Sequence, residues 1–404
     1  MDGHASSGRT MNIARDTWWI LLLLVLPNAC LAQVHDVLCN AGNSSFEATF
    51  RTGVTVSIGA QKENEFSTRA CQGTLSWGKQ KLVIASGVRL LDLDMFGVDL
   101  GSGVPVAGFA AAKASDACCT TYQIYSLNQP PRLLRTITGG GFFDAADTDL
   151  DGDVEVWTDD SGAVDGFEGL TPGEIEFVPT YVLRLDHGRL LDASSEFKAF
   201  FDGVIKSVQS KIKPQSLNDF KASDGRLQAS HDSSAQELVR LQKMRAVKIQ
   251  ALEVVWAYLY SDREKEAWQS LAEMWPASDV ERIRGEILKA RSRGIHAQLD
   301  GATKGKLIKH SQPIFNLSEV TPAKAILMRV YPPESQDASL GQKEVHIELV
   351  IDSAGKVRSV KPAGETKPLE QFVRVSASRW KFIPAFKNDR PVAMRMHTII
   401  SPQQ

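Results

Sequence analysis

The sequence lacks the short motifs that mark the common enzyme classes. It has no GxSxG nucleophile elbow, no HExxH zinc motif, no P-loop and no GxGxxG dinucleotide fingerprint. It has no CxxC pair, the signature of a thiol oxidoreductase, and none of its eight histidines lies at metal-ligand spacing from another. The glycine run at residues 139–141 stands alone between apolar segments, which favours a turn over a phosphate cradle. Nothing in the sequence therefore argues for an enzyme.

The sequence also lacks a large excess of positive or negative charge. Lys plus Arg amounts to 46 residues against 48 for Asp plus Glu, so the formal net charge is −2. Binding to nucleic acid or to an anionic membrane surface needs a concentrated positive field, which this balance gives no reason to expect. The 404 residues are 43% hydrophobic and 23% charged, close to the globular average, and this length predicts two or three domains.

Long apolar runs are missing as well, and the run nearest the amino terminus predicts export. Residues 18–26 are apolar, whereas a membrane span needs about 20 such residues. Arg9 and Arg15 precede this run, and small residues at Cys30 and Ala32 follow it. The pattern is typical of a signal peptide over residues 1–32 with the mature chain beginning at Gln33. The alternatives are a retained membrane anchor and a buried helix.

Cleavage at that point would leave four of the five cysteines. We expect Cys39 and Cys71 to pair, since an even count in an exported protein is compatible with disulfides. Cys118 and Cys119 are adjacent, and a bridge between them would be strained. Two buried thiols or reduced loop residues are the alternative for that pair.

Residues 33–190 have the pattern of many short strands separated by turn residues. An internal similarity lies within this region, because residues 99–106 align with residues 149–156. A turn-then-strand unit repeated at this spacing is typical of propeller-like or stacked β repeats, although two copies are too few for a closed propeller. The predicted strands cover residues 54–58, 81–84, 104–109, 121–126, 154–157 and 181–185.

From residue 191 to residue 300 the apolar spacing becomes helical. Three capping boxes, at residues 234–237, 261–264 and 278–281, each predict the start of a helix. The short connections predict antiparallel helical hairpins. Residues 301–323 have little periodicity, which predicts a linker.

Residues 324–404 return to a β pattern in the order β-β-α-β-β. This block resembles the TonB C-terminal domain family. Its most specific feature is the strand from Trp380 to Ala385, followed by a turn and then Pro391 and Val392. The other shared residues are Tyr331, Pro332, Pro333, Gly341, Arg390 and the turn residues Ile351, Asp352, Ser353, Ala354, Gly355, Lys356 and Val357.

The resemblance implies a binding mode. In TonB-type proteins this domain reaches across the periplasm and pairs with a peptide of an outer-membrane transporter by β-augmentation. The implied docking edge is the last strand, residues 392–400, whose one face carries Val392, Met394, Met396, Thr398 and Ile400. The chain departs from the family in its predicted cleavable signal, in the absence of a Pro-rich spacer, and in Asp389 at a position where a turn glycine is usual.

Residues 143–155 are similar to FG-GAP or VCBS-type repeats. Acidic residues at every second position, with Gly152 permitting a tight turn, can converge on one hard cation such as Ca²⁺. An EF-hand is excluded because the twelfth loop position is Thr158. The alternative to a cation site is a solvated acidic turn that caps a strand. The candidate ligands are Asp147, Asp149, Asp151, Asp153 and Glu155.

These patterns predict an α+β multidomain chain with an all-β, repeat-like first part, a central antiparallel helical segment and a small TonB-like end. The leading hypothesis is a non-enzymatic periplasmic or exported envelope protein that binds a protein partner, such as an outer-membrane transporter or its peptide. A second hypothesis is a TonB-type energy transducer, which requires the amino-terminal segment to stay in the membrane. A third is a secreted enzyme or carbohydrate-binding protein with its site in the β part.

Overall fold

The computed structural model describes residues 37–61, 70–115, 118–169, 177–228, 234–303, 311–328, 344–362 and 373–400. These all belong to one unit of the chain, residues 34–404. The predicted signal segment, residues 1–32, lies outside the described residues. Within the described residues, no helix has both the length and the apolar character needed to cross a membrane. The fold mixes helices with antiparallel sheets, as the predicted α+β class requires.

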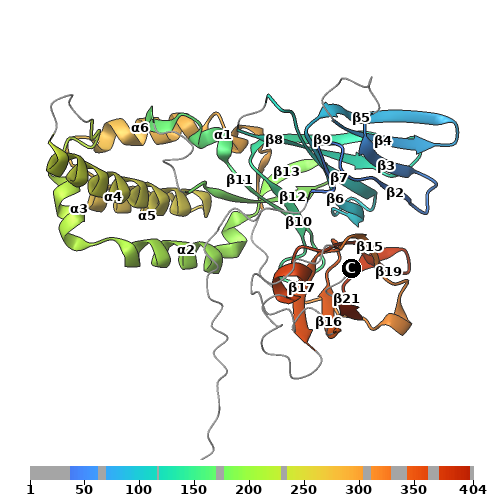
Figure 1. Cartoon of the computed structure of the whole chain (residues 1–404). Coiled ribbons are helices and arrows are strands. Elements are labelled where there is room, and N and C mark those ends of the chain that lie inside the picture. The colour runs from blue at the N-terminus through green and yellow to red at the C-terminus, as the bar shows by residue number, and fades with distance from the viewer. Residues whose placement is uncertain are drawn as a thin grey trace, which may run out of the picture. The chain divides into compact units, whose positions relative to one another are not determined.

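Two antiparallel sheets form the first part of the chain (Figure 1). The buried residues of both sheets meet in one core that contains Val56, Leu75, Phe96 and Phe109. One sheet contains β2 (Phe46–Thr49), β3 (Thr55–Ala60), β4 (Cys71–Trp77) and β5 (Gln80–Val88) in that order. The other has the order β1-β6-β7-β8-β9, with β1 (Cys39–Asn40), β6 (Leu90–Asp99), β7 (Pro105–Ala112), β8 (Thr120–Ser126) and β9 (Leu133–Gly140).

The predicted disulfide between Cys39 and Cys71 is confirmed. Cys39 lies in β1 and Cys71 in β4, so the bond joins the two sheets, and both residues are fully buried. The loop that it closes spans a sequence separation of 32 residues. The bond therefore restricts the unfolded chain as well as clamping the folded one.

A third sheet continues the β part and shares its core with helices. It has the order β10-β11-β12-β13-β14. Tyr181 and Leu183 of this sheet belong to the same buried cluster as Trp256 and Tyr260 of the longest helix. The predicted boundary between residues 190 and 191 falls inside β13, and one core extends across it. The strands are β10 (Phe143–Ala146), β11 (Glu155–Asp159), β12 (Thr180–Asp186), β13 (Arg189–Asp192) and β14 (Gly301–Ala302).

The helices of the middle region lie alongside one another (Figure 1). Ser234 caps the longest of them as predicted, because its side chain accepts a hydrogen bond from the Glu237 amide. Ser261 and Ser278 do not cap the next two, which follow Arg263 and Asp279. The helices are α1 (Ser161–Val164), α2 (Lys198–Lys211), α3 (Pro214–Lys221), α4 (Ala235–Tyr260), α5 (Glu264–Met274) and α6 (Val280–Arg291).

The end of the chain forms a smaller module with its own core, in which Trp380, Phe382 and Met394 are buried. Its main sheet has the order β17-β16-β21, next to the pairs β15-β18 and β19-β20, and residues 373–377 are helical. The strands are β15 (Lys324–Leu327), β16 (Val345–Ile351), β17 (Val357–Pro362), β18 (Lys381–Ile383), β19 (Ala385–Lys387), β20 (Arg390–Val392) and β21 (Met394–Ile400).

Two expectations for this end of the chain need correction. The predicted last strand, residues 392–400, is two strands, because Val392 pairs with Ala385 in the β19-β20 hairpin while β21 pairs with β16. The described parts of the predicted linker, residues 301–323, also make backbone pairs: Gly301 with Leu191, Phe315 with Met394 and Thr321 with Phe386. Low periodicity in the sequence did not reveal these pairs, because single bridges leave no alternating pattern.

The structure contains a second disulfide, between the adjacent Cys118 and Cys119, and the two bonds should differ in their contribution to stability. The double variant Cys39→Ala/Cys71→Ala should lose about 3 kcal/mol in the free energy of unfolding, because closing a loop of this length removes much of the unfolded chain's entropy. Urea unfolding measures the loss. The matched variant Cys118→Ala/Cys119→Ala opens a loop of adjacent residues and should lose much less. Equal losses in the two variants would contradict this explanation.

Candidate functional site

The acidic turn between β10 and β11 closes around Asp147. This side chain is almost fully buried, and its two carboxylate oxygens accept hydrogen bonds from the amides of Asp151 and Gly152, each at 3.0 Å. Gly152 has a φ of +92°, which a residue with a side chain rarely adopts. Burial raises the pKa of Asp147 to about 6, against the opposing effect of its hydrogen bond from Ser353.

Three of the five predicted cation ligands come together in this turn. Carboxylate oxygens of Asp147, Asp149 and Asp151 lie within 4.8 Å of one another. Oxygen donors at this spacing suit a hard cation such as Ca²⁺. Asp153 does not belong to this cluster, and its amide instead donates to the Asp151 carboxylate at 2.9 Å.

Glu155 is also absent from the cluster that the structure forms. Its carboxylate forms a 2.6 Å ion pair with Arg184, whose other guanidinium nitrogen contacts Glu196 at 3.0 Å. Burial raises the pKa of Glu155 to about 7, and the hydrogen bond from Arg184 opposes that rise. A buried guanidinium needs carboxylate partners, and Glu155 is one of the two that Arg184 contacts.

A cavity of about 250 Å³ lies beside the acidic turn. Both copies of the internal similarity contribute to its wall, through Gly101 from the first and Val154 from the second. Arg184 also lines it, but that side chain is already paired with two carboxylates. Asp186, another lining residue, contacts His187 at 2.5 Å. Two of the charged side chains that line the cavity, Arg184 and Asp186, therefore already have partners within the protein.

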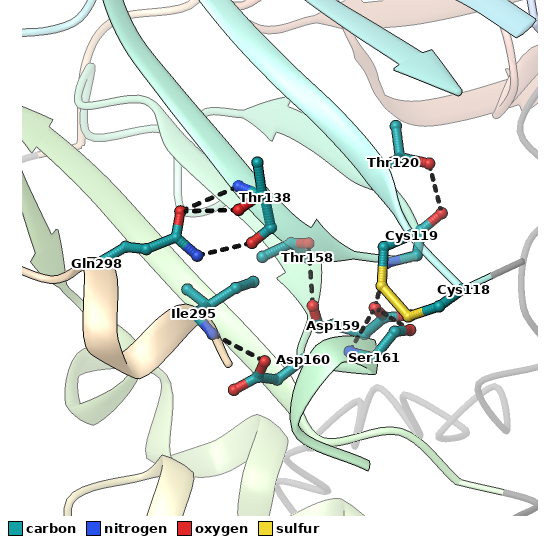
Figure 2. The surroundings of a disulfide bond; sticks show 11 residues. Cys118, Cys119, Thr120, Thr138, Thr158, Asp159, Asp160, Ser161, Ile295 and Gln298 are labelled. Atoms are coloured by element: carbon teal, nitrogen blue, oxygen red, sulfur yellow. Dashed lines mark hydrogen bonds between the residues drawn. A yellow bond between two sulfur atoms is a disulfide. The ribbon is translucent and has the colours of Figure 1, made fainter. Parts of the chain in front are cut away.

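Cys118 and Cys119 are also joined by a disulfide, at the start of β8 (Figure 2). Nearby, Asp159 accepts hydrogen bonds from the hydroxyl of Ser161 and from the amide of Gly141. The glycine run beside it permits close packing, because a Cβ on Gly140 would lie 2.3 Å from the Thr158 hydroxyl. The run therefore has a packing role in this structure.

The first turn of the carboxy-terminal module contacts the acidic turn directly. The side chain of Asp352 closes its own turn by accepting from the Lys356 amide at 2.8 Å, and its other oxygen accepts from the Asp147 amide at 3.0 Å. Ser353 donates its hydroxyl proton to the Asp147 carboxylate at 2.9 Å. Gly355 has no space for a side chain, since a Cβ there would lie 1.9 Å from the Phe382 carbonyl oxygen. Burial raises the pKa of Asp352 to about 7.

Lys356 anchors this contact. Its amine lies 2.5 Å from Asp94 and 2.6 Å from Asp144, and only 9% of its side chain is exposed. Burial alone would lower the pKa of this amine, but the two carboxylates hold it above its usual value. Tyr122 donates its hydroxyl proton to Asp94 at 2.6 Å. A second lysine, Lys381, donates to Asp92 on the same strand, β6.

The sequence analysis did not identify Asp92 and Asp94 as partners of the two lysines, although their position in β6 indicates that they need partners. Asp92 and Asp94 alternate with Leu91, Leu93 and Met95 in β6, whose residues 91–98 are otherwise apolar and are all buried. A carboxylate in such a strand needs a buried partner. The sequence did not identify the partners because Lys356 and Lys381 lie more than 250 residues further along the chain.

The proposed docking edge is the outer side of β21. Arg395 donates its amide proton to the Phe315 carbonyl at 2.8 Å, away from β16. Because backbone groups alternate along a strand, the amides and carbonyls of His397 and Ile399 point to the same outer side. Among the described residues, no backbone partner pairs with β21 on that side beyond Arg395.

The side chains predicted at this edge face inward. Val392, Met394 and Ile400 are buried in the core of the module, and Met396 and Thr398 are half-buried. On the opposite face, Arg395 forms a 3.1 Å ion pair with Glu348, and Ile399 is 49% exposed. The side chains of the predicted face therefore hold β21 in the module's core. A guest strand would instead meet the backbone groups along the outer edge of β21.

No protein-family model matches the chain, and no curated protein matches its sequence. The resemblances to the TonB C-terminal domain and to FG-GAP-like repeats therefore stay predictions.

Loss of the Lys356 amine should be costly. In Lys356→Met, Asp94 and Asp144 lose a buried partner, and the free energy of unfolding should fall by about 3–5 kcal/mol. Urea unfolding followed by circular dichroism measures the change. The control is Lys361→Met on the exposed side of β17, which should change stability by less than about 0.5 kcal/mol. Similar values for the two variants would show that Lys356 is solvated rather than paired.

Proposed function

We propose that this chain is an exported cell-envelope protein that binds partner proteins by strand pairing at β21 and catalyses no reaction of its own. The observation that carries the proposal is the outer edge of β21, where His397 and Ile399 direct backbone groups away from β16. An exposed strand edge is a template for a guest strand, which gains affinity from main-chain hydrogen bonds. The TonB-like motifs at Trp380 and Pro391 supply independent support from the sequence.

The module's attachment to the β part favours a binding role over an energy-transducing one. An energy transducer needs its end domain to move relative to the rest of the chain. Here Lys356 and Lys381 are both engaged by carboxylates of β6. Separating the module from the β part would break both lysine–carboxylate pairs, together with the hydrogen bonds that join Asp352 and Ser353 to Asp147. We expect the β part to present the module in a fixed position to its partner.

We also propose that the acidic turn holds Ca²⁺ through Asp147, Asp149 and Asp151. Carboxylates that converge in this way repel one another, and a bound cation would offset that repulsion. The turn also contacts the carboxy-terminal module through Asp147. The cation would therefore stiffen the surface against which the module lies.

The strand-pairing proposal predicts a position-specific effect of proline. In His397→Pro the outward-pointing amide is lost, while the hydrogen bonds between β21 and β16 use the amides of alternate residues. Capture of an envelope partner by the full chain, measured by pull-down and quantitative mass spectrometry, should fall at least about tenfold.

The matched control is His397→Ala, which keeps the amide and should keep the partner. Circular dichroism checks that both variants are folded. Equal capture by the two variants would argue against pairing at this edge.

The cation proposal predicts a carboxylate-specific effect on thermal stability. Calcium should raise the melting temperature of the native chain and should have little effect on Asp149→Asn/Asp151→Asn. Asp153→Asn, outside the cluster, should respond as the native chain does. A similar calcium response in all three proteins would rule out this site.

The affinity for calcium should also depend on pH. Because burial raises the pKa of Asp147 to about 6, protons compete with the cation below that pH. Isothermal titration calorimetry should therefore show weaker binding at pH 5 than at pH 7. Unchanged affinity across this range would mean that Asp147 is not a ligand.

A further inference from the structure

The outer edge of β21 is already partly occupied by the chain itself. Phe315 donates its amide proton to the Ala393 carbonyl at 3.0 Å and accepts from the Arg395 amide at 2.8 Å. The two segments run parallel, as a bridge between Phe315 and Met394. These are the backbone contacts that a guest strand would make at the beginning of this edge.

The segment that contains Phe315 is fixed at both ends. At one end, the Gln312 amide donates to the Leu150 carbonyl in the acidic turn at 2.7 Å. At the other, Thr321 exchanges two backbone hydrogen bonds with Phe386 of β19, at 2.8 and 2.9 Å. Between them lies the single turn η4 (Leu317–Glu319). We refer to residues 312–321 as the strap.

The strap is held by few buried side chains. Most of its residues are exposed, and Leu317 is 58% exposed. The Phe315 ring is half-buried and lies 3.8 Å from the Lys387 amine, measured to the ring centroid. Phe315 and Val320 pack against the module's core only as partly buried side chains. Hydrophobic burial scales with the area removed from water, so the strap gains less from packing than a core strand does and relies more on its backbone hydrogen bonds. A segment held in this way is displaced more easily than a core strand.

We propose that the strap is an autoinhibitory element of the β21 edge. Beyond Arg395, the edge offers a guest only the backbone groups of His397 and Ile399. A guest strand that pairs along the whole edge must take the hydrogen bonds that Ala393 and Arg395 make with Phe315. The strap therefore lowers the affinity for guests, and its release exposes the full edge. This inference rests on the proposed strand-pairing function.

The test compares the native full chain with Phe315→Pro, which removes the amide that donates to Ala393. The control is Leu317→Ala, an exposed strap residue outside the bridge. The probe is a fluorescein-labelled peptide with the sequence of residues 311–321, which carries the backbone and side chains that already fit this edge. Binding is measured by fluorescence anisotropy, and residue-resolved amide exchange is followed by nuclear magnetic resonance.

In Phe315→Pro, the Arg395 amide should exchange at least about tenfold faster than in the native chain, while the Leu349 amide in β16 stays protected. This variant should bind the peptide at least about tenfold more tightly than the native chain and Leu317→Ala do.

The remaining outcomes separate the two proposals. If all three proteins bind the peptide equally, the edge accepts strands but the strap does not inhibit it, and the inference is overturned while strand pairing stands. If Phe315→Pro frees the Arg395 amide but binds no peptide, both the inference and the proposed function fail. If the Arg395 amide exchanges equally fast in all three, the strap does not cover the edge in solution, and the inference is overturned.

Discussion

The buried amine of Lys356, held between Asp94 and Asp144, is the interaction on which the rest of the structure depends. Burying a charge costs several kcal/mol unless it is paired, so the buried Lys356 and Asp94 each need the other, and the half-buried Asp144 adds a second carboxylate to the amine. Asp94 belongs to a buried strand of the β part, and Lys356 follows the first turn of the carboxy-terminal module. The pairing therefore requires the module to lie against the β part in one particular way.

Contacts spread from this pair to both candidate sites. The turn that ends at Lys356 also presents Asp352 and Ser353 to Asp147, the central residue of the acidic turn. The acidic turn holds the strap at Gln312, and the strap pairs at Phe315 with the edge of β21. The candidate cation site and the candidate docking edge thus belong to one continuous set of contacts. A change at the acidic turn has a direct structural route to the edge through four residues of the strap.

The features that the sequence predicted well depend on neighbours along the chain. The alternation of β3 and of the first half of β16, the start of α4 after Ser234 and the convergence of Asp147, Asp149 and Asp151 in one turn are all local. The Cys39–Cys71 pair was expected from the even number of cysteines left in an exported chain, and it is confirmed. Ser261 shows how a local rule fails, because its hydroxyl donates to the Ala257 carbonyl at 2.8 Å and so closes the preceding helix instead of opening the next.

The features that were missed depend on distant parts of the chain. Glu155 has the spacing of a cation ligand, but Arg184 on the neighbouring strand takes it. Val392 continues the alternation of the last strand, but the hairpin with Ala385 separates it from β21. An ion pair between residues far apart in the sequence, such as Asp94 and Lys356, cannot be predicted from local patterns. The sequence indicates only that a charged residue in an apolar strand must have a buried partner.

A double-mutant cycle on Asp94 and Lys356 tests the central claim most directly. The free energy of unfolding is measured by urea denaturation for the native chain, Asp94→Asn, Lys356→Met and the double variant. The buried pair predicts a coupling energy of at least about 2 kcal/mol, with the double variant more stable than the sum of the single losses implies. Additive losses would mean that the two groups do not meet in solution, and the account would then have lost its central interaction.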